Sequence, residues 1–138
     1  MVTSSAESER ALVKAALDAF VRTVEERNLD GLSGVVAQDP DLMWIATGED
    51  EWIVGYDALK EAMRAQNEAL EYIRISVSEE TIHLSPSEQV AWATNRWIFR
   101  ARMAGNELKL PLRCTWVAEK RDGDWVLVHS HKSVGAAG

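Results

Sequence analysis

The stretch GDWVLVHSHKS, residues 123–133, carries the side chains of this sequence best suited to chemistry. Two of the three histidines, His129 and His131, stand two residues apart, and Trp125 and Leu127 precede them at the same spacing. Side chains two residues apart lie on the same face of a β-strand. The four side chains are therefore expected on one face of a strand near the end of the chain.

The dipeptide Asp122-Gly123 predicts the direction of that face, because it is typical of a two-residue hairpin loop. Such a loop places Trp116 opposite His129, and it places Cys114 opposite His131. The preceding strand has one clearly apolar face, formed by Leu108, Leu110, Leu112, Cys114, Trp116 and Ala118. We therefore expect both histidines to point into the interior, although a loop of odd length would reverse the two faces.

Three interpretations of His129 and His131 follow from the chemistry of imidazole. The two rings could bind a metal, but His83 is the one further histidine, so no metal and no other cofactor is expected. They could be hydrogen-bonded core residues. They could also form the polar floor of a pocket and act as catalytic acid or base, which we favour because two adjacent imidazoles are hard to satisfy in a dry core.

Tryptophan is unusually frequent, with six residues against two Phe and two Tyr. Such bulky rings can fill a core or form the walls of a cavity for an organic molecule. A guanidinium can in addition pair with a ligand carboxylate through two hydrogen bonds. The candidate ligand-binding residues are Trp44, Tyr56, Trp92, Arg96 and Trp116.

The segment 90–103 carries aromatic side chains at both even and odd positions, so both faces of this strand are apolar. Which face points inward therefore depends on the length of the next turn. A two-residue turn at Gly105-Asn106 would bring the Asn95 and Trp97 face inward. A three-residue turn would bring Trp92 and Arg96 inward. Two apolar faces indicate that both are covered, one by helices and one by another subunit.

Composition limits the class of protein. A chain of 138 residues with 46% apolar content suits one domain, taken here as residues 1–138. A net charge of -7 argues against nucleic acid and anionic membranes as partners. The sequence contains no apolar run of the ~20 residues that span a bilayer and no signal-peptide pattern, so a cytoplasmic protein is expected.

Periodicity predicts helices early in the chain and strands late. Helical spacing predicts a first helix that ends near Asn28, a short second helix over 29–37 and a third over 55–70. Strands are expected at 42–47, 51–54, 72–84, 90–103, 108–120 and 125–132. This order indicates an α+β domain with three N-terminal helices packed on a curved, mostly antiparallel sheet, whose open end forms a cavity.

The order of elements and two motifs, TGEDEWIVGYDALKEA and RDGDWVLVHSHKS, resemble the SnoaL-like domains of the nuclear-transport-factor-2-like (NTF2-like) superfamily, also called cystatin-like. The resemblance covers roughly residues 6–133. It implies a cone-shaped fold, a conical pocket and a homodimer formed through the sheet. It does not imply one activity, because the superfamily holds isomerases, dehydratases, epoxide hydrolases, polyketide cyclases and non-catalytic assembly modules.

Catalytic residues of that superfamily have to be compared one by one. Phe20 stands where ketosteroid isomerases carry a tyrosine, and Trp44 stands near their general base. Ile98 stands where limonene epoxide hydrolases carry a catalytic aspartate. The sequence therefore predicts a protein that binds a small, largely apolar organic molecule, with or without a carboxylate. Such a protein could be a cofactor-independent isomerase, cyclase or hydrolase; the alternative is a non-catalytic binding or assembly module.

Overall fold

The computed structural model describes residues 5–136, which form an α+β fold, as expected. Two α-helices, α1 (Ser5–Glu25) and α2 (Tyr56–Ala69), and a short 3-10 helix, η1 (Leu29–Gly34), occupy the first half of the chain. Six strands follow or separate them: β1 (Met43–Ile45), β2 (Trp52–Val54), β3 (Ile73–Leu84), β4 (Val90–Met103), β5 (Asn106–Arg121) and β6 (Asp124–Ser133).

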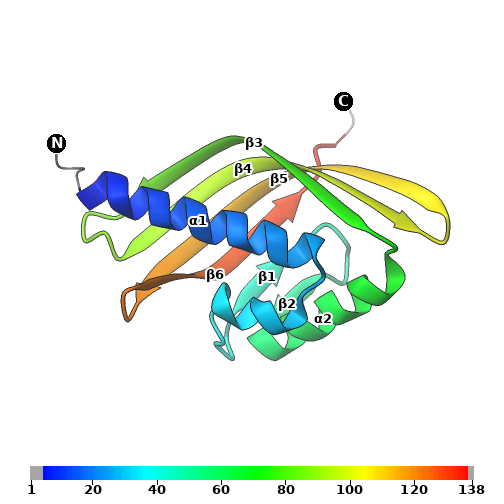
Figure 1. The fold of residues 1–138 in the computed structure, drawn as a ribbon, viewed down its shortest axis with the longest axis horizontal. Helices are drawn as coiled ribbons and strands as arrows, with labels where there is room; N and C mark the ends of the chain where they lie inside the picture. The colour runs from blue at the N-terminus through cyan, green and yellow to red at the C-terminus, as the bar shows by residue number, and fades with distance from the viewer. Residues whose placement is uncertain (1–4, 137–138) are drawn as a thin grey trace.

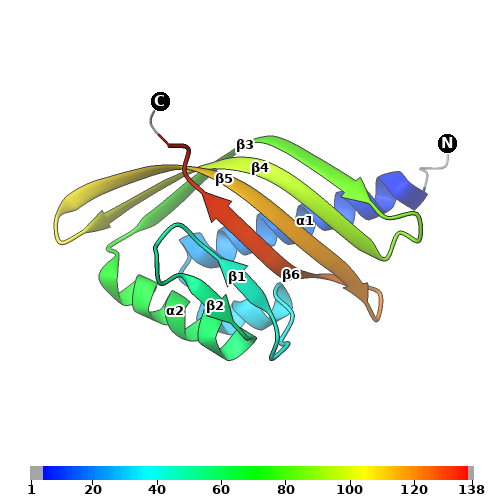
Figure 2. The same cartoon turned by 180° about the vertical axis from the view of Figure 1, so that it is seen from behind.

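The strands form one sheet in the order β2-β1-β6-β5-β4-β3. All neighbours are antiparallel except β1 and β6, which pair in parallel. The sheet curves around α1, which crosses its concave face (Figure 1). Seen from behind, no helix of the described residues 5–136 covers the outer face of β3 to β6 (Figure 2). No helix within residues 5–136 is long and apolar enough to cross a membrane.

The two α-helices bury apolar stripes against the sheet. Val13, Leu17 and Phe20 recur at helical spacing in α1 and are almost completely buried. After α1, the side chain of Asn28 accepts a hydrogen bond from the backbone N–H of Gly31 at 3.1 Å and caps η1. Leu59 of α2 is also buried, so α2 closes the lower side of the sheet.

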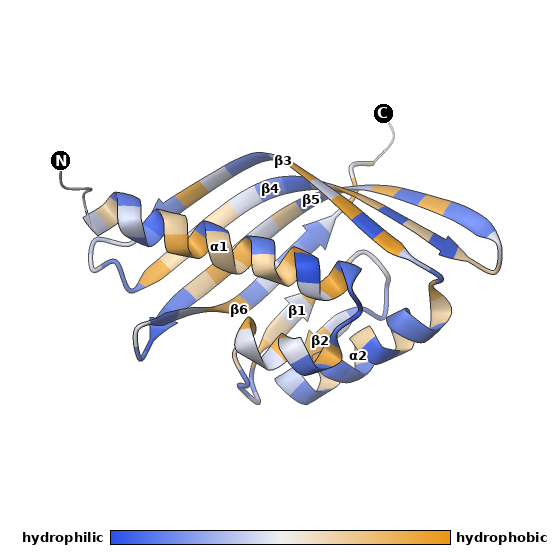
Figure 3. Cartoon of the chain, in the orientation of Figure 1, coloured by the Kyte–Doolittle hydropathy of each residue, from blue (hydrophilic) through white to orange (hydrophobic). Residues whose placement is uncertain are grey.

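The β4–β5 hairpin confirms one of the two faces considered for residues 90–103. Met103 pairs with Asn106, so the loop is the dipeptide Ala104-Gly105, one residue earlier than expected but still two residues long. Both loop residues have positive φ, as such tight turns require. Asn95 and Trp97 therefore point inward, and hydropathy alternates along the strands (Figure 3).

The β5–β6 hairpin begins as predicted and then departs from it. Arg121 pairs with Asp124 across the loop, and Ala118 pairs with Leu127. The next pair is Val117 with His129, so Val128 is an extra residue, a β-bulge. A bulge reverses which residues of a strand point to each face. From this point, the side chains that point inward are Ser130 and Lys132.

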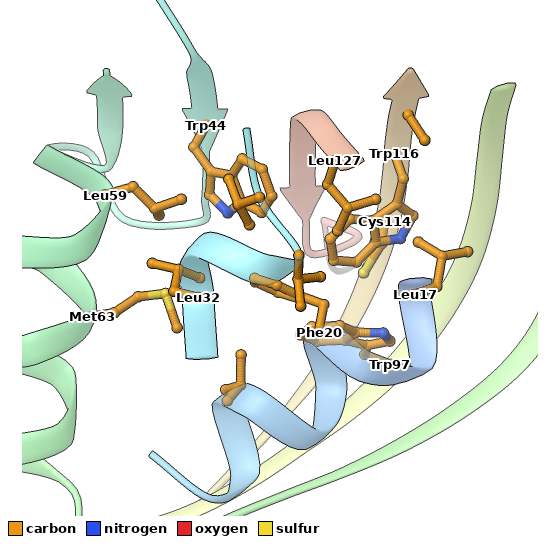
Figure 4. Packing of buried hydrophobic residues seen from close by; sticks show 14 of the residues in the cluster. Leu17, Phe20, Leu32, Trp44, Leu59, Met63, Trp97, Cys114, Trp116 and Leu127 are labelled. Carbon is orange, nitrogen blue, oxygen red and sulfur yellow. The ribbon is translucent and has the colours of Figure 1, made fainter. Parts of the chain in front are cut away.

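The interior is built around four aromatic rings from four elements. Phe20 of α1 lies 5.4 Å from both Trp44 of β1 and Trp116 of β5, measured between ring centroids. Trp97 of β4 lies 5.3 Å from Trp116. Figure 4 shows these rings in one group, with the α2 side chains Leu59 and Met63 facing them.

Candidate functional site

A cavity of about 530 Å³ lies between the sheet and the two α-helices. Its closed end is formed by buried side chains and its mouth by exposed ones, which include Thr47, Glu51 and Leu110. Most of the wall is apolar, and the polar side chains in it are Thr47, Glu51, Gln66 and Lys132. The lining thus suits a small, largely apolar molecule that is held by few polar groups.

The walls come from all parts of the chain. The aromatic walls are Phe20, Trp44, Trp97 and Phe99, contributed by α1, β1 and β4. The helix α2 supplies the opposite wall through Leu59, Met63 and Gln66, among others. This arrangement requires the sheet to curve, because residues on β1 and β5 must face the same space.

Lys132 is the one cation in the cavity wall among the described residues, and it is buried. Its ammonium lies 4.3 Å from the ring centroid of Trp116, and 5.1 to 5.8 Å from the centroids of Trp97, Trp44 and Phe20. Ring faces attract cations, so this cage stabilises the charged amine. Three of the four rings also line the cavity, which places the amine directly beside it.

The hydrogen bonds of Lys132 leave its charge without a counter-ion. Its Nζ donates to the hydroxyl of the fully buried Ser130 at 2.8 Å. Among residues 5–136, no carboxylate oxygen lies within 4.0 Å of this Nζ. Burial lowers the pKa of Lys132 to about 8, although the charge of Glu51 opposes the shift. The wall of the cavity therefore holds an amine whose pKa lies well below that of an exposed lysine.

The other titratable groups near the amine have different properties. Burial raises the pKa of the Cys114 thiol to about 11, so the thiol stays protonated near neutral pH. Glu51 stands at the mouth, where its side chain accepts a hydrogen bond from the backbone N–H of Gly48 at 2.8 Å. Within residues 5–136, no cluster of three His, Cys, Asp or Glu side chains is arranged to hold a metal ion.

The sequence of residues 13–137 matches the family model of the SnoaL-like domain. The chain belongs to this family. A search for related sequences among curated proteins finds no match. The match confirms the resemblance seen in the sequence motifs.

Solved structures share the fold of this SnoaL-like domain over nearly its whole length. An NTF2-like superfamily protein from Salmonella enterica serovar Typhimurium is 15% identical, with a TM-score of 0.87, over 96% of this chain and 95% of that one. A candidate dehydratase of the NTF2-like family from Streptomyces avermitilis is 15% identical, with a TM-score of 0.83, over 95% of this chain and 99% of that one.

A candidate calcium/calmodulin-dependent protein kinase II association domain from Xanthomonas campestris is 20% identical, with a TM-score of 0.78, over 91% of this chain and 87% of that one. At these identities the likeness shows a shared NTF2-like fold, which hosts unrelated activities. The activity therefore has to be argued from the site itself.

The expectation that His129 and His131 face the interior of the SnoaL-like domain is wrong. The bulge at Val128 turns both onto the outer face, where His131 is exposed. The Nδ1 atom of His129 lies 2.9 Å from the backbone oxygen of Met43, a contact between β6 and β1. Neither ring lines the cavity between the sheet and the helices.

Among the five candidate ligand-binding residues, Trp44 lies in the cavity wall and Trp116 lies behind Lys132. Tyr56 is buried at the start of α2 but does not line the cavity. Trp92 and Arg96 lie on the outer face of the sheet and not in the wall of this cavity.

On that outer face, Trp92 stacks on His83 at 5.6 Å between centroids, and Arg96 forms an ion pair with Glu79. A shallow depression of about 460 Å³ there includes Arg96, Arg113 and His131. The group that the sequence analysis missed is Lys132. Lys132 stands two residues after Ser130, so the two side chains share one face of β6. This spacing became informative only once it was known that this face points inward.

Proposed function

We propose that the cavity binds a small, largely apolar organic molecule that directs an anionic or carbonyl oxygen toward Lys132. The observation that carries this proposal is the buried ammonium of Lys132, which lacks a carboxylate partner within residues 5–136 and adjoins the cavity. A ligand oxygen can supply the missing charge-assisted hydrogen bond. The apolar walls then bury the rest of the molecule.

A matched pair of probes tests this binding. Trp44 and Trp97 line the cavity, so a ligand should change the intrinsic tryptophan fluorescence. We expect 2-naphthoate to bind more tightly than 2-naphthamide, because only the carboxylate carries a charge. The variant Lys132→Met should remove this preference, at a loss of about 1–3 kcal/mol of binding free energy for the unmade charged contact.

The variant His131→Ala is the control, because His131 lies on the other face of the sheet. It should bind naphthoate like the wild type. Binding of both probes that Lys132→Met leaves unchanged would contradict the proposal. So would a loss of naphthoate affinity in His131→Ala that matches the loss in Lys132→Met.

Cofactor-independent proton transfer is a second candidate, and the lowered pKa of Lys132 favours it. This proposal gives the acid and base role, first expected of the two histidines, to Lys132. Glu51 offers a carboxylate at the mouth of the same cavity. An isomerase, cyclase or hydrolase step needs such groups within hydrogen-bond reach of the substrate atoms that gain or lose a proton. A non-catalytic module would show binding without turnover.

The pH dependence separates the two roles of Lys132. If the charged ammonium binds an anion, affinity falls as the pH rises through about 8, because the charge is lost. If the neutral amine acts as a base, kcat/KM rises through the same range, because kcat/KM reports the pKa of the free enzyme. A turnover rate that is independent of Lys132 would rule out the catalytic role.

We also propose that residues 1–138 form one domain that dimerises through the outer face of its sheet. Figure 2 shows that no helix within residues 5–136 covers this face, and Trp92 is exposed on it. The variants Ile98→Glu and Trp92→Glu should shift the sedimenting species toward the monomer. Leu12→Glu, at an exposed apolar position of α1, should not. A wild-type monomer at micromolar concentration would contradict this proposal.

A further inference from the structure

We propose that Lys132 captures an aldehyde or ketone covalently, as a protonated imine on its side-chain nitrogen. This inference rests on the proposed function, because the carbonyl compound would occupy the same cavity. It narrows the ligand class from molecules with an anionic or carbonyl oxygen to carbonyl compounds with an apolar body.

The surroundings of Lys132 make its amine available as a nucleophile. Lys14 lies within 3.5 Å of Asp18 and 3.3 Å of Glu80, and Lys120 lies 2.6 Å from Glu9. Such ion pairs stabilise the protonated form. Lys132 has no such partner among the described residues, so deprotonation breaks no ion pair. With a pKa of about 8, roughly a tenth of Lys132 is neutral near pH 7, against fewer than about one in a thousand for an exposed lysine.

The hydrogen-bonding capacity of the site fits an imine better than an ammonium. An ammonium carries three N–H donors. Among residues 5–136, Ser130 Oγ is the one acceptor that Lys132 Nζ reaches, at 2.8 Å. A protonated imine carries a single N–H, so this one acceptor satisfies it completely. Conversion to the imine thus removes two buried N–H donors that would otherwise need hydrogen-bond acceptors.

The aromatic cage fits the same product. The imine keeps the positive charge, so the faces of Phe20, Trp44, Trp97 and Trp116 continue to attract it. The cation is now planar, and it can stack on a ring face as a guanidinium does. The apolar wall also keeps bulk water away from the C=N bond, which water would otherwise hydrolyse.

The reaction balances without any further reagent. The lone pair of the neutral amine attacks the carbonyl carbon, a C–N bond forms, and the carbonyl oxygen takes a proton. The oxygen then leaves as water with a second proton, and the C=N bond forms. In sum, Lys–NH₃⁺ and R₂C=O give Lys–NH⁺=CR₂ and H₂O. Charge and atoms are conserved, and the Ser130 hydroxyl lies beside the reacting nitrogen, 2.8 Å from Nζ.

The charged and titratable groups that face this amine are few. Glu51 before β2 acts on it electrostatically and favours its protonated form, whereas the Cys114 thiol of β5 stays protonated near neutral pH. The side chains of α1, β1 and β4 that touch it are the aromatic rings of Phe20, Trp44 and Trp97. Capture should therefore become faster as the pH rises toward about 8, and it should follow the titration of Lys132 itself.

Reductive trapping tests the proposal. The protein is incubated with 2-naphthaldehyde and sodium cyanoborohydride, and the intact mass and peptide map are measured. We expect one saturable adduct at Lys132, formed at least about tenfold faster than at the other lysines. Lys132→Met and Lys132→Arg should lose this adduct. Arginine keeps the charge but does not form a stable imine, so Lys132→Arg should still bind 2-naphthoate. Lys109→Met, at an exposed lysine, is the control and should be labelled like the wild type.

The outcomes separate this inference from the proposed function. Naphthoate binding to the wild type without trapping at Lys132 overturns the imine alone. Absence of both naphthoate binding and trapping overturns the proposed function as well. An adduct spread evenly over all lysines, or one that persists in Lys132→Met, also overturns the inference. If Lys132→Arg does not fold, Lys132→Met and the peptide map of the wild type still decide it.

Discussion

The ammonium of Lys132 lies 4.3 Å from the centroid of the Trp116 ring, at the closed end of the cavity. Trp116 is held in place by its own hydrogen bond, in which its Nε1–H donates to Asn95 Oδ1 at 3.0 Å. The Asn95 amide in turn donates to Glu80 Oε2 at 3.0 Å. The position of the buried cation thus depends on a hydrogen-bonded chain that crosses three strands.

The buried charge of Lys132 should lower stability near neutral pH, and Lys132→Met should relieve this. The pKa of Lys132 is about 8 in the folded protein and 10.5 in an exposed lysine. Below pH 8 both states carry the proton, and the full cost of burying the charge is present. Between the two values the unfolded state binds more protons, so stability rises with pH. Above both values the cost is gone.

We therefore expect Lys132→Met to raise the free energy of unfolding by about 3–4 kcal/mol near pH 7, because the pKa falls from 10.5 to about 8 and each pKa unit corresponds to about 1.4 kcal/mol. The gain should shrink as the pH approaches about 10. Urea denaturation at both pH values measures it. A variant that is less stable than the wild type, by the same amount at both pH values, would show that burial of this charge carries no such cost.

Ser130→Ala should destabilise the protein through Lys132. The substitution removes the hydroxyl that accepts from Nζ, and it leaves a buried ammonium without that partner. We expect a loss of about 1–3 kcal/mol near pH 7. In the Lys132→Met background the same change should cost clearly less, because no donor remains to be satisfied. A double-mutant cycle measures the difference, and additive effects would argue against the coupling.

Trp116→Phe and Trp97→Phe form a matched pair. Both side chains are buried, but the Nε1–H of Trp97 has no hydrogen-bond partner within residues 5–136. Trp116→Phe leaves Asn95 Oδ1 without the donor that it has now. We expect Trp116→Phe to lower the free energy of unfolding by about 1 kcal/mol more than Trp97→Phe. Chemical denaturation of both variants tests this, and equal losses would contradict it.

Gly55→Ala should disturb the start of α2 and with it one wall of the cavity. Gly55 has a φ of +94°, and a Cβ there would lie 3.0 Å from the backbone oxygen of Pro40. We expect a loss of about 1–2 kcal/mol from the left-handed backbone and the crowding. Gly34→Ala is the control, because nothing lies within 4 Å of its added Cβ. It should be neutral or stabilise by up to about 1 kcal/mol. Equal thermal stability of the two variants would contradict this account.

Local sequence patterns predicted the elements and their order. Val13, Leu17 and Phe20 recur at helical spacing because one side of their helix is buried. This pattern does not depend on how the helix is placed in an α+β fold. The dipeptide Asp122-Gly123 predicted its tight loop, because both residues tolerate the positive φ that they adopt. The family followed from the same local motifs, as the match over residues 13–137 confirms.

The face of each late strand was only partly readable. For β4 the choice between the Trp92 and Trp97 faces depended on the length of one turn, and the two-residue alternative was correct. Both faces of β4 carry aromatic residues, so composition alone could not show which face belongs to the core and which to the outer surface. Trp92 remains exposed because the helices cover the opposite side of the sheet (Figure 1).

Tertiary structure decided which side chains of β6 point into the cavity. A regular β6 would have turned His129 and His131 inward, and the bulge at Val128 turned Ser130 and Lys132 inward instead. The bulge lies where β6 leaves its bridge to Val36 and begins to pair with β1, at Met43. These pairings join residues more than eighty positions apart. Local spacing determines which side chains share a face of a strand, whereas distant strand pairing determines which of the two faces is buried.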